Sequence, residues 1–180
     1  YLALRALALG LERDAPLHPY TREQIGRLTT EASFCARMRA DPRAARVFVE
    51  LIASRREGRF LAGSVARELH DLGLLLAMVP EFLPVVGRVH HDLYHVYTVD
   101  VHSVAALDKL GQLARGELAA SYPLASRLAA EAQNFTTLAF ATLLHDVGKA
   151  IGRRDHSERG AELAVEILGR LGLAQDETEQ

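Results

Sequence analysis

Residues 134–150, NFTTLAFATLLHDVGKA, combine an apolar helical run with a polar ending. Asn134 is a favourable N-cap, and the ten residues after it are apolar nearly all round a helix, interrupted only by threonines. A helix without a polar face needs other elements around it, so we expect this one to be central and buried. Gly148 is predicted to end it. His145 and Asp146 would then lie at the end of a core helix, partly removed from water.

The rest of the chain also follows a helical period, which predicts an all-α fold. Thr21 with Gln24 has the spacing of a capping box and predicts a helix that runs to about residue 38. Asp41–Pro42 predicts the start of another helix, which ends near residue 55. Further helices are expected over about 2–11, 64–72, 99–113, from 123 onward, and 157–171.

Residues 78–95, MVPEFLPVVGRVHHDLYH, are punctuated by proline and glycine and predict short helical turns and a loop. This stretch divides the chain. We assign residues 1–77 to a helical linker or packing region and residues 78–180 to the domain that carries the function.

Composition excludes several classes of function. The 180 residues have a formal net charge of -2, so no overall positive field would attract nucleic acid or an anionic membrane. The most apolar run is interrupted by Pro80, Glu81 and Pro84, which predicts that it does not span a bilayer. Cys35 is the only cysteine, so no intrachain disulfide forms and a cytoplasmic location is expected. Because the sequence starts without Met and already in a helical pattern, we expect a piece of a longer protein.

The His145–Asp146 pair has two readings. A carboxylate in a buried position needs a partner, and a divalent cation satisfies both it and the neighbouring imidazole. The alternative is that Asp146 accepts hydrogen bonds from backbone or an arginine, while His145 is a core histidine with its own partner. The following Gly148 and Lys149, and the other histidines of this half of the chain, favour the metal.

His102 is the best candidate for a third ligand. On its predicted helix it shares a face with Val99, Ala106 and Leu110, so we expect its imidazole to point toward the core. A core histidine bonded to a carbonyl group is the alternative.

Other polar residues near the pair are each compatible with more than one role. Lys149 is placed to offset charge on a phosphate, or simply to complement a helix C-terminus. His156 lies just before the last predicted helix and is equally compatible with binding a second metal, binding a phosphate, or no role at all. His90, His91 and His95 precede the helix of His102 and are more typical of structural or surface positions, with a pocket mouth as the alternative.

The order of a histidine on one helix, then His-Asp and Gly-Lys at the end of another, resembles the HD superfamily of metal-dependent phosphohydrolases. The first three ligands of its H…HD…D pattern match His102, His145 and Asp146. Residues 79–107, with LLHDVGKA and RDHSERGAELA further on, are more closely similar to one branch of it. That branch is the HD domain of the bifunctional enzymes that attach uridylyl groups to the PII nitrogen-signalling protein and remove them. The similarity is strong from about residue 78 to residue 173.

The resemblance implies hydrolysis of uridylyl-tyrosine on PII, releasing UMP. It also implies that this domain works within a chain that carries a nucleotidyltransferase domain before it and glutamine-sensing ACT domains after it. The last aspartate ligand of the family is expected beyond residue 180, because Asp176 is too near the preceding helix. We therefore expect the metal site, and the activity, to be incomplete in these 180 residues alone.

The mechanism that follows is metal-assisted hydrolysis, with Mn²⁺ or Mg²⁺ as the expected ion and Fe²⁺ as an alternative. Asp146 would bind the metal and orient the nucleophile, while Lys149 or His156 offsets charge on the phosphate. Two other functions stay open at this point. One is an HD phosphohydrolase that acts on a nucleotide or cyclic dinucleotide, and the other is a non-catalytic helical module that docks PII or transmits the glutamine signal.

Overall fold

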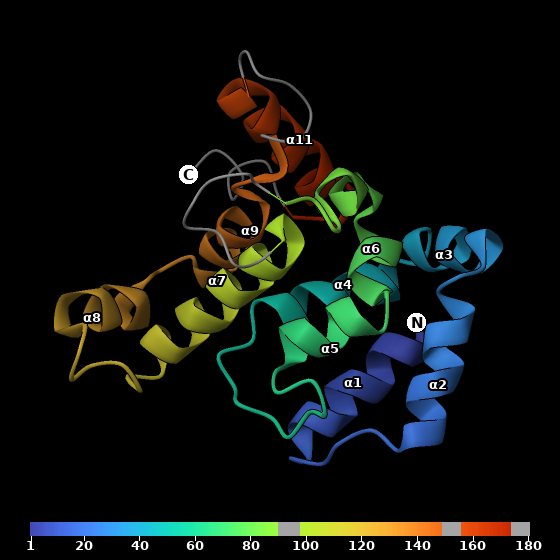
Figure 1. Ribbon diagram of the computed structural model, residues 1–180, viewed down its shortest axis with the longest axis horizontal. Helices are drawn as coiled ribbons and strands as arrows, with labels where there is room; N and C mark the ends of the chain where they lie inside the picture. The colour runs from blue at the N-terminus through green and yellow to red at the C-terminus, as the bar shows by residue number, and fades with distance from the viewer. Residues whose placement is uncertain (90–97, 149–155, 174–180) are drawn as a thin grey trace. The chain divides into compact units, whose positions relative to one another are not determined.

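A computed structural model describes residues 1–89, 98–148 and 156–173 of the chain. Within these ranges the regular elements are helices and no strand occurs, so the predicted all-α fold is confirmed. The chain divides into two compact units, Tyr1–Pro80 and Glu81–Gln180, each of which is described by itself (Figure 1). No described helix is both long and apolar enough to cross a membrane.

The first unit is a cluster of short helices. Its elements are α1 (Leu2–Glu12), α2 (Pro19–Leu28), α3 (Ala32–Arg39), α4 (Pro42–Ile52), α5 (Val65–Asp71) and α6 (Leu74–Met78). Helix α4 packs on α1, α3 and α5, and α6 packs on α3 and α5. The core is formed by fully buried side chains that recur at helical spacing, Leu4 and Leu7 on α1 and Phe48 on α4 among them.

Capping residues explain where most of these helices begin. The Asp41 carboxylate accepts from the Arg43 N–H at 2.9 Å, which confirms the predicted start of α4 at Pro42. The Ser64 hydroxyl caps α5 in the same way through the Arg67 N–H. The capping box predicted at Thr21 is wrong, because α2 already begins at Pro19. Proline is well suited to the first helical position, and the N-cap of α2 is His18, three residues before Thr21.

The single helix predicted from Thr21 to Met38 is also wrong, because the chain breaks it into α2 and α3. Thr29 ends α2, and its hydroxyl donates to the carbonyl oxygens of Gly26 at 2.9 Å and Leu72 at 2.7 Å. The second of these bonds joins α2 to the turn between α5 and α6. In that turn Gly73 has a φ of +69°, and a Cβ there would lie 2.9 Å from the Thr29 Oγ1. Tertiary contacts at Thr29 therefore override the local helical pattern.

An ion pair is buried inside the first unit. The carboxylate of Glu68 on α5 has 0% side-chain exposure and receives a hydrogen bond from the guanidinium of Arg22 on α2. The other carboxylate oxygen accepts from the Ala62 N–H at 3.2 Å. Both oxygens of this buried carboxylate are therefore hydrogen-bonded, which meets the usual condition for burying such a group.

The second unit is built around α7. Its elements are the 3₁₀ turn η1 (Pro80–Val85), which starts at the boundary, and the helices α7 (Val99–Ala114), α8 (Pro123–Glu131), α9 (Phe135–Leu144) and α11 (His156–Arg170). Helix α7 packs on both α8 and α9, and α11 packs on α9 (Figure 1). The buried side chains of α9 are Phe135, Ala139, Phe140, Leu143 and Leu144.

Helix α9 differs from its predicted form in two ways. Asn134 caps it as expected, accepting from the Thr137 N–H at 3.1 Å. However, it ends at Leu144 rather than at Gly148, and it is not buried all round, since Leu138 is 36% exposed. Because α9 packs on α7 and α11, its neighbours cover only part of its circumference. The apolar composition of α9 therefore predicted a deeper burial than the helix has in the structure.

Two sets of contacts position α7 and α11. The Val99 N–H donates to the Arg88 carbonyl at 2.9 Å, and the Gly87 N–H donates to the buried Asp100 carboxylate at 3.2 Å, so the first turn of α7 is tied to the residues after η1. At the far end of α11, the Arg170 guanidinium forms a two-pronged ion pair with the Glu81 carboxylate. This hydrogen-bonded pairing raises the pKa of Arg170 above its ordinary value.

Candidate metal site

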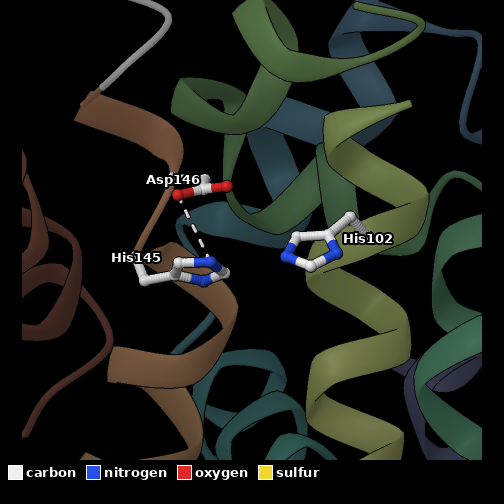
Figure 2. Close-up of side chains that lie close together, drawn as sticks. All are labelled: His102, His145 and Asp146. Carbon is white, nitrogen blue, oxygen red and sulfur yellow. Dashed lines mark ion pairs between the residues drawn. The ribbon is translucent and has the colours of Figure 1, made fainter. Parts of the chain in front are cut away.

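The structure brings His102, His145 and Asp146 together at the second unit's α7–α9 contact. His102 lies in the first turns of α7, His145 is the C-cap of α9, and Asp146 follows it. Each side chain offers one ligand atom, and these atoms lie within 4.8 Å of one another (Figure 2). In the part of the chain that the structure describes, this is the one group of three or more His, Cys, Asp or Glu residues arranged to hold a metal ion.

The end of α9 fixes the orientation of His145. A helix leaves its last four carbonyl groups without intrahelical partners, and α9 ends just before His145. The Thr142 carbonyl is one of them, and it lies 2.8 Å from Nδ1 of His145. A carbonyl can only accept, so Nδ1 carries the proton in this contact and Nε2 is left as the ligand atom. Nε2 lies 3.2 Å from the Asp146 carboxylate, on the side of His102 (Figure 2).

Burial differs sharply among the three residues. The Asp146 side chain is 8% exposed, whereas that of His145 is 40% exposed. His102 is half-buried, and its ring meets the ring of His145 edge-on, with centroids 5.5 Å apart. The site is therefore open on the His145 side and closed around the carboxylate. The sequence predicted that the His102 imidazole points into the core. In the structure His102 is only half-buried and lies at the edge of the buried face of α7.

These residues fit a divalent cation. Two imidazole nitrogens and one carboxylate oxygen are a donor set that suits first-row divalent ions and Mg²⁺. With metal–ligand distances of about 2.1 Å, neighbouring ligand atoms lie roughly 3–4 Å apart, so small side-chain rotations bring the three onto one ion. The exposure of His145 also argues against the alternative in which it is a core histidine.

The remaining candidates fall outside what the structure describes. Lys149 lies outside the described residues, as do His90, His91 and His95. His156 is the first residue of α11, but its side chain is not among those described. The structure therefore leaves the predicted roles of Lys149 and His156 as predictions.

Sequence reasoning missed the contribution of Thr142. Its backbone carbonyl, rather than its side chain, holds His145, so no residue type marks the position. The only signal in the sequence is that Thr142 lies three residues before a histidine at the end of a helix. This signal can be used only if the end of the helix is predicted correctly.

The segment that contains the three candidate ligands is similar to a known protein family. Residues 99–179 match the HD domain family. The second half of the chain is thus similar to HD domains. This match contains His102, His145 and Asp146, and together with the donor set it supports a divalent metal as the cofactor of the domain.

Curated relatives are similar over most of the chain, and each bears the name bifunctional uridylyltransferase/uridylyl-removing enzyme. The protein of Gluconobacter oxydans is 39% identical over 97% of this chain, and that of Azospirillum brasilense is 35% identical over 98% of it. The protein of Novosphingobium aromaticivorans is 40% identical over 80% of it. The chain spans only 18%, 18% and 15% of the length of these relatives. No solved structure matches the chain.

The HD domain and the names of the relatives support a metal-dependent phosphohydrolase family for this chain. The similarity predicted from the sequence is thus confirmed at the level of the domain and its relatives.

Proposed function

We propose that this chain contributes the uridylyl-removing activity of a bifunctional enzyme, hydrolysing the phosphodiester that joins UMP to a tyrosine of PII. The observation that carries the proposal is the convergence of His102, His145 and Asp146 at the end of α9, within the segment that matches the HD domain. The name of the relatives includes uridylyl removal, and PII as the protein substrate comes from the resemblance described in the sequence analysis.

In the proposed site His102, His145 and Asp146 hold a divalent cation, with Mn²⁺ or Mg²⁺ preferred and Fe²⁺ as an alternative. When bound, the cation supplies Lewis acidity and lowers the pKa of water at the site. Nε2 of His145 faces the other two ligand atoms because Nδ1 is held by the Thr142 carbonyl. Asp146 would orient the attacking water through its carboxylate, in addition to binding the metal.

Lys149 and His156 complete the proposal as catalytic residues. Each would offset negative charge on the phosphate, Lys149 from the segment after Gly148 and His156 from the start of α11. In the whole protein, residues 78–180 would form the first part of the HD domain and residues 1–77 would connect it to a nucleotidyltransferase domain. ACT domains would supply the response to glutamine.

The test is UMP release from uridylylated PII by a protein extended past residue 180, with Mn²⁺ present. We expect release by the parent protein, and a loss of at least about 100-fold on Asp146→Asn, because a ligand and the group that orients water are changed together. His18→Asn is the matched control, since it removes an imidazole remote in sequence and keeps a side chain able to cap α2.

The rival functions give different results in the same assay. A phosphohydrolase of another substrate class would leave uridylyl-PII intact but hydrolyse a nucleotide or a cyclic dinucleotide, with the same sensitivity to Asp146→Asn. A docking module would bind PII and release nothing from any of these substrates. Either result would contradict the proposed activity.

A further inference from the structure

Helix α11 approaches the backbone just after the candidate metal pair. A Cβ built on Gly160, in the second turn of α11, would lie 3.5 Å from the Cα of Gly148 and 3.6 Å from its amide nitrogen. These are ordinary van der Waals distances, so the gap between α11 and Gly148 admits a methyl group and little more.

Gly148 is buried and lies two residues after Asp146, in the segment that follows the C-cap of α9. The chain leaves α9 at His145 and presents two candidate ligands in succession. Helix α11, which packs on α9, therefore lies about one methyl group away from the segment that carries these ligands.

The other end of α11 is held independently. The Arg170 guanidinium binds the Glu81 carboxylate through both of its oxygens, with Nη2 at 2.9 Å from Oε2. Side chains near that end, Ile167 and Leu168, are buried as well. An obstruction at Gly160 would therefore push against Gly148, because α11 is fixed at its far end.

We propose that Gly160 is a positioning residue for the metal site: its lack of a side chain lets α11 support the backbone of Gly148 and so hold His145 and Asp146 in place. The inference rests on the proposed metal-binding function. It predicts a size limit at position 160, where alanine fits and a branched side chain does not.

The contact itself is tested by NMR without metal. In Gly160→Ala, the new methyl group should show nuclear Overhauser effects to the amide and α protons of Gly148. Absence of these effects in the folded protein would overturn the proposal, whatever the metal does.

The consequence is tested by Mn²⁺ titration of the protein extended past residue 180. Gly160→Ala should bind Mn²⁺ within about twofold of the parent protein, and Gly160→Val should bind it about 10- to 100-fold more weakly, the usual effect of disturbing a group that supports a ligand. Gly169→Val is the matched control, because Gly169 is on the same helix with nothing within 4 Å of its added Cβ. It makes the same change in helix propensity as Gly160→Val and should leave the affinity for Mn²⁺ unchanged.

The outcomes separate this proposal from the function on which it rests. If the parent protein binds no Mn²⁺, the proposed metal function fails. If the parent binds and a folded Gly160→Val binds equally well, or if Gly169→Val weakens binding as much, the positioning role fails alone. Should Gly160→Val not fold, Gly160→Ser takes its place with an expected loss at the lower end of that range, about 10-fold, and parent-like affinity in that variant would overturn the role.

Discussion

Glu68 in the first unit and Asp146 in the second both carry buried carboxylates, with side chains 0% and 8% exposed, yet their surroundings differ in kind. Glu68 is bonded to the guanidinium of Arg22, a permanent cation that the chain itself supplies. Asp146 lies beside two imidazoles, whose nitrogens can accept a proton or bind a metal.

The difference shows what each carboxylate contributes. A buried carboxylate with its own arginine joins two helices, and its charge is balanced for as long as the fold persists. A buried carboxylate that converges with two imidazoles offers a ligand set to an exchangeable cation. The first arrangement therefore stabilises the fold, and the second is the one that we propose to bind a metal.

Breaking the pair in the first unit should have the largest effect on stability. Arg22→Met leaves Glu68 buried without its cation, and we expect the free energy of unfolding to fall by about 3–5 kcal/mol. Urea denaturation followed by circular dichroism measures the change. Arg27→Met is the control, because the Arg27–Glu23 pair is exposed and is expected to contribute no more than about 0.5 kcal/mol.

A double variant tests whether the carboxylate left alone is the cause. Adding Glu68→Leu to Arg22→Met removes the unpaired charge, so most of the lost stability should return. If the double variant is no more stable than Arg22→Met, the comparison with Asp146 loses its physical basis.

Substituting Ser103, the neighbour of His102 on α7, should change the free energy of unfolding by less, and in the opposite direction. Its hydroxyl is fully buried and has no hydrogen-bond partner within the described ranges 1–89, 98–148 and 156–173. Ser103→Ala removes that desolvated group, so we expect the protein to become more stable by about 1 kcal/mol. Thermal unfolding by calorimetry measures the gain.

Ser64→Ala is the matched serine substitution. Its hydroxyl caps α5, so the same change there should cost about 1 kcal/mol. A loss of stability on Ser103→Ala would mean that the hydroxyl is bonded after all, and that the second unit satisfies its buried polar groups as fully as the first.

The sequence predicted elements where a local residue type determines the result. Asp41, Asn134 and Pro123 mark helix starts, and the structure places α4, α9 and α8 there. Helical spacing and the family pattern also predicted His102, His145 and Asp146 as ligands, and the structure brings these side chains together, while their role as ligands stays a prediction.

The wrong predictions arose where contacts with residues distant in the sequence determine the structure. The break at Thr29 depends on a bond to Leu72, 43 residues away, and the exposure of Leu138 depends on which helices cover α9. The approach of Gly160 to Gly148 likewise depends on the packing of α11 on α9. Residue patterns carry information about faces and ends of helices, but not about which helices meet.

Asp41 extends the comparison to a partly exposed carboxylate with its own arginine, where the expected effect on stability is smallest. Hydrogen bonds from the Arg43 guanidinium lower the pKa of Asp41 from 3.8 to about 2. Its contribution to stability should therefore be complete above about pH 4 and disappear as the pH falls through 2. Asp41→Asn keeps the cap of α4 and removes only the charge.

The urea midpoints of Asp41→Asn and the parent protein should differ slightly at pH 7, and the difference should shrink between pH 4 and pH 2. A difference that stays constant or grows over that interval would contradict the assignment to the ionised carboxylate.

The central claim is that His102, His145 and Asp146 bind a divalent cation, and calorimetric titration with Mn²⁺ tests it most directly. Both the 180-residue chain and a protein extended past residue 180 should be titrated, each with His145→Ala and with His18→Asn as the control. We predict that the extended protein binds Mn²⁺, that His145→Ala weakens binding by at least about 100-fold, and that His18→Asn leaves it unchanged. If neither protein binds Mn²⁺, or if His145→Ala binds it as the parent does, the three residues are not a metal site.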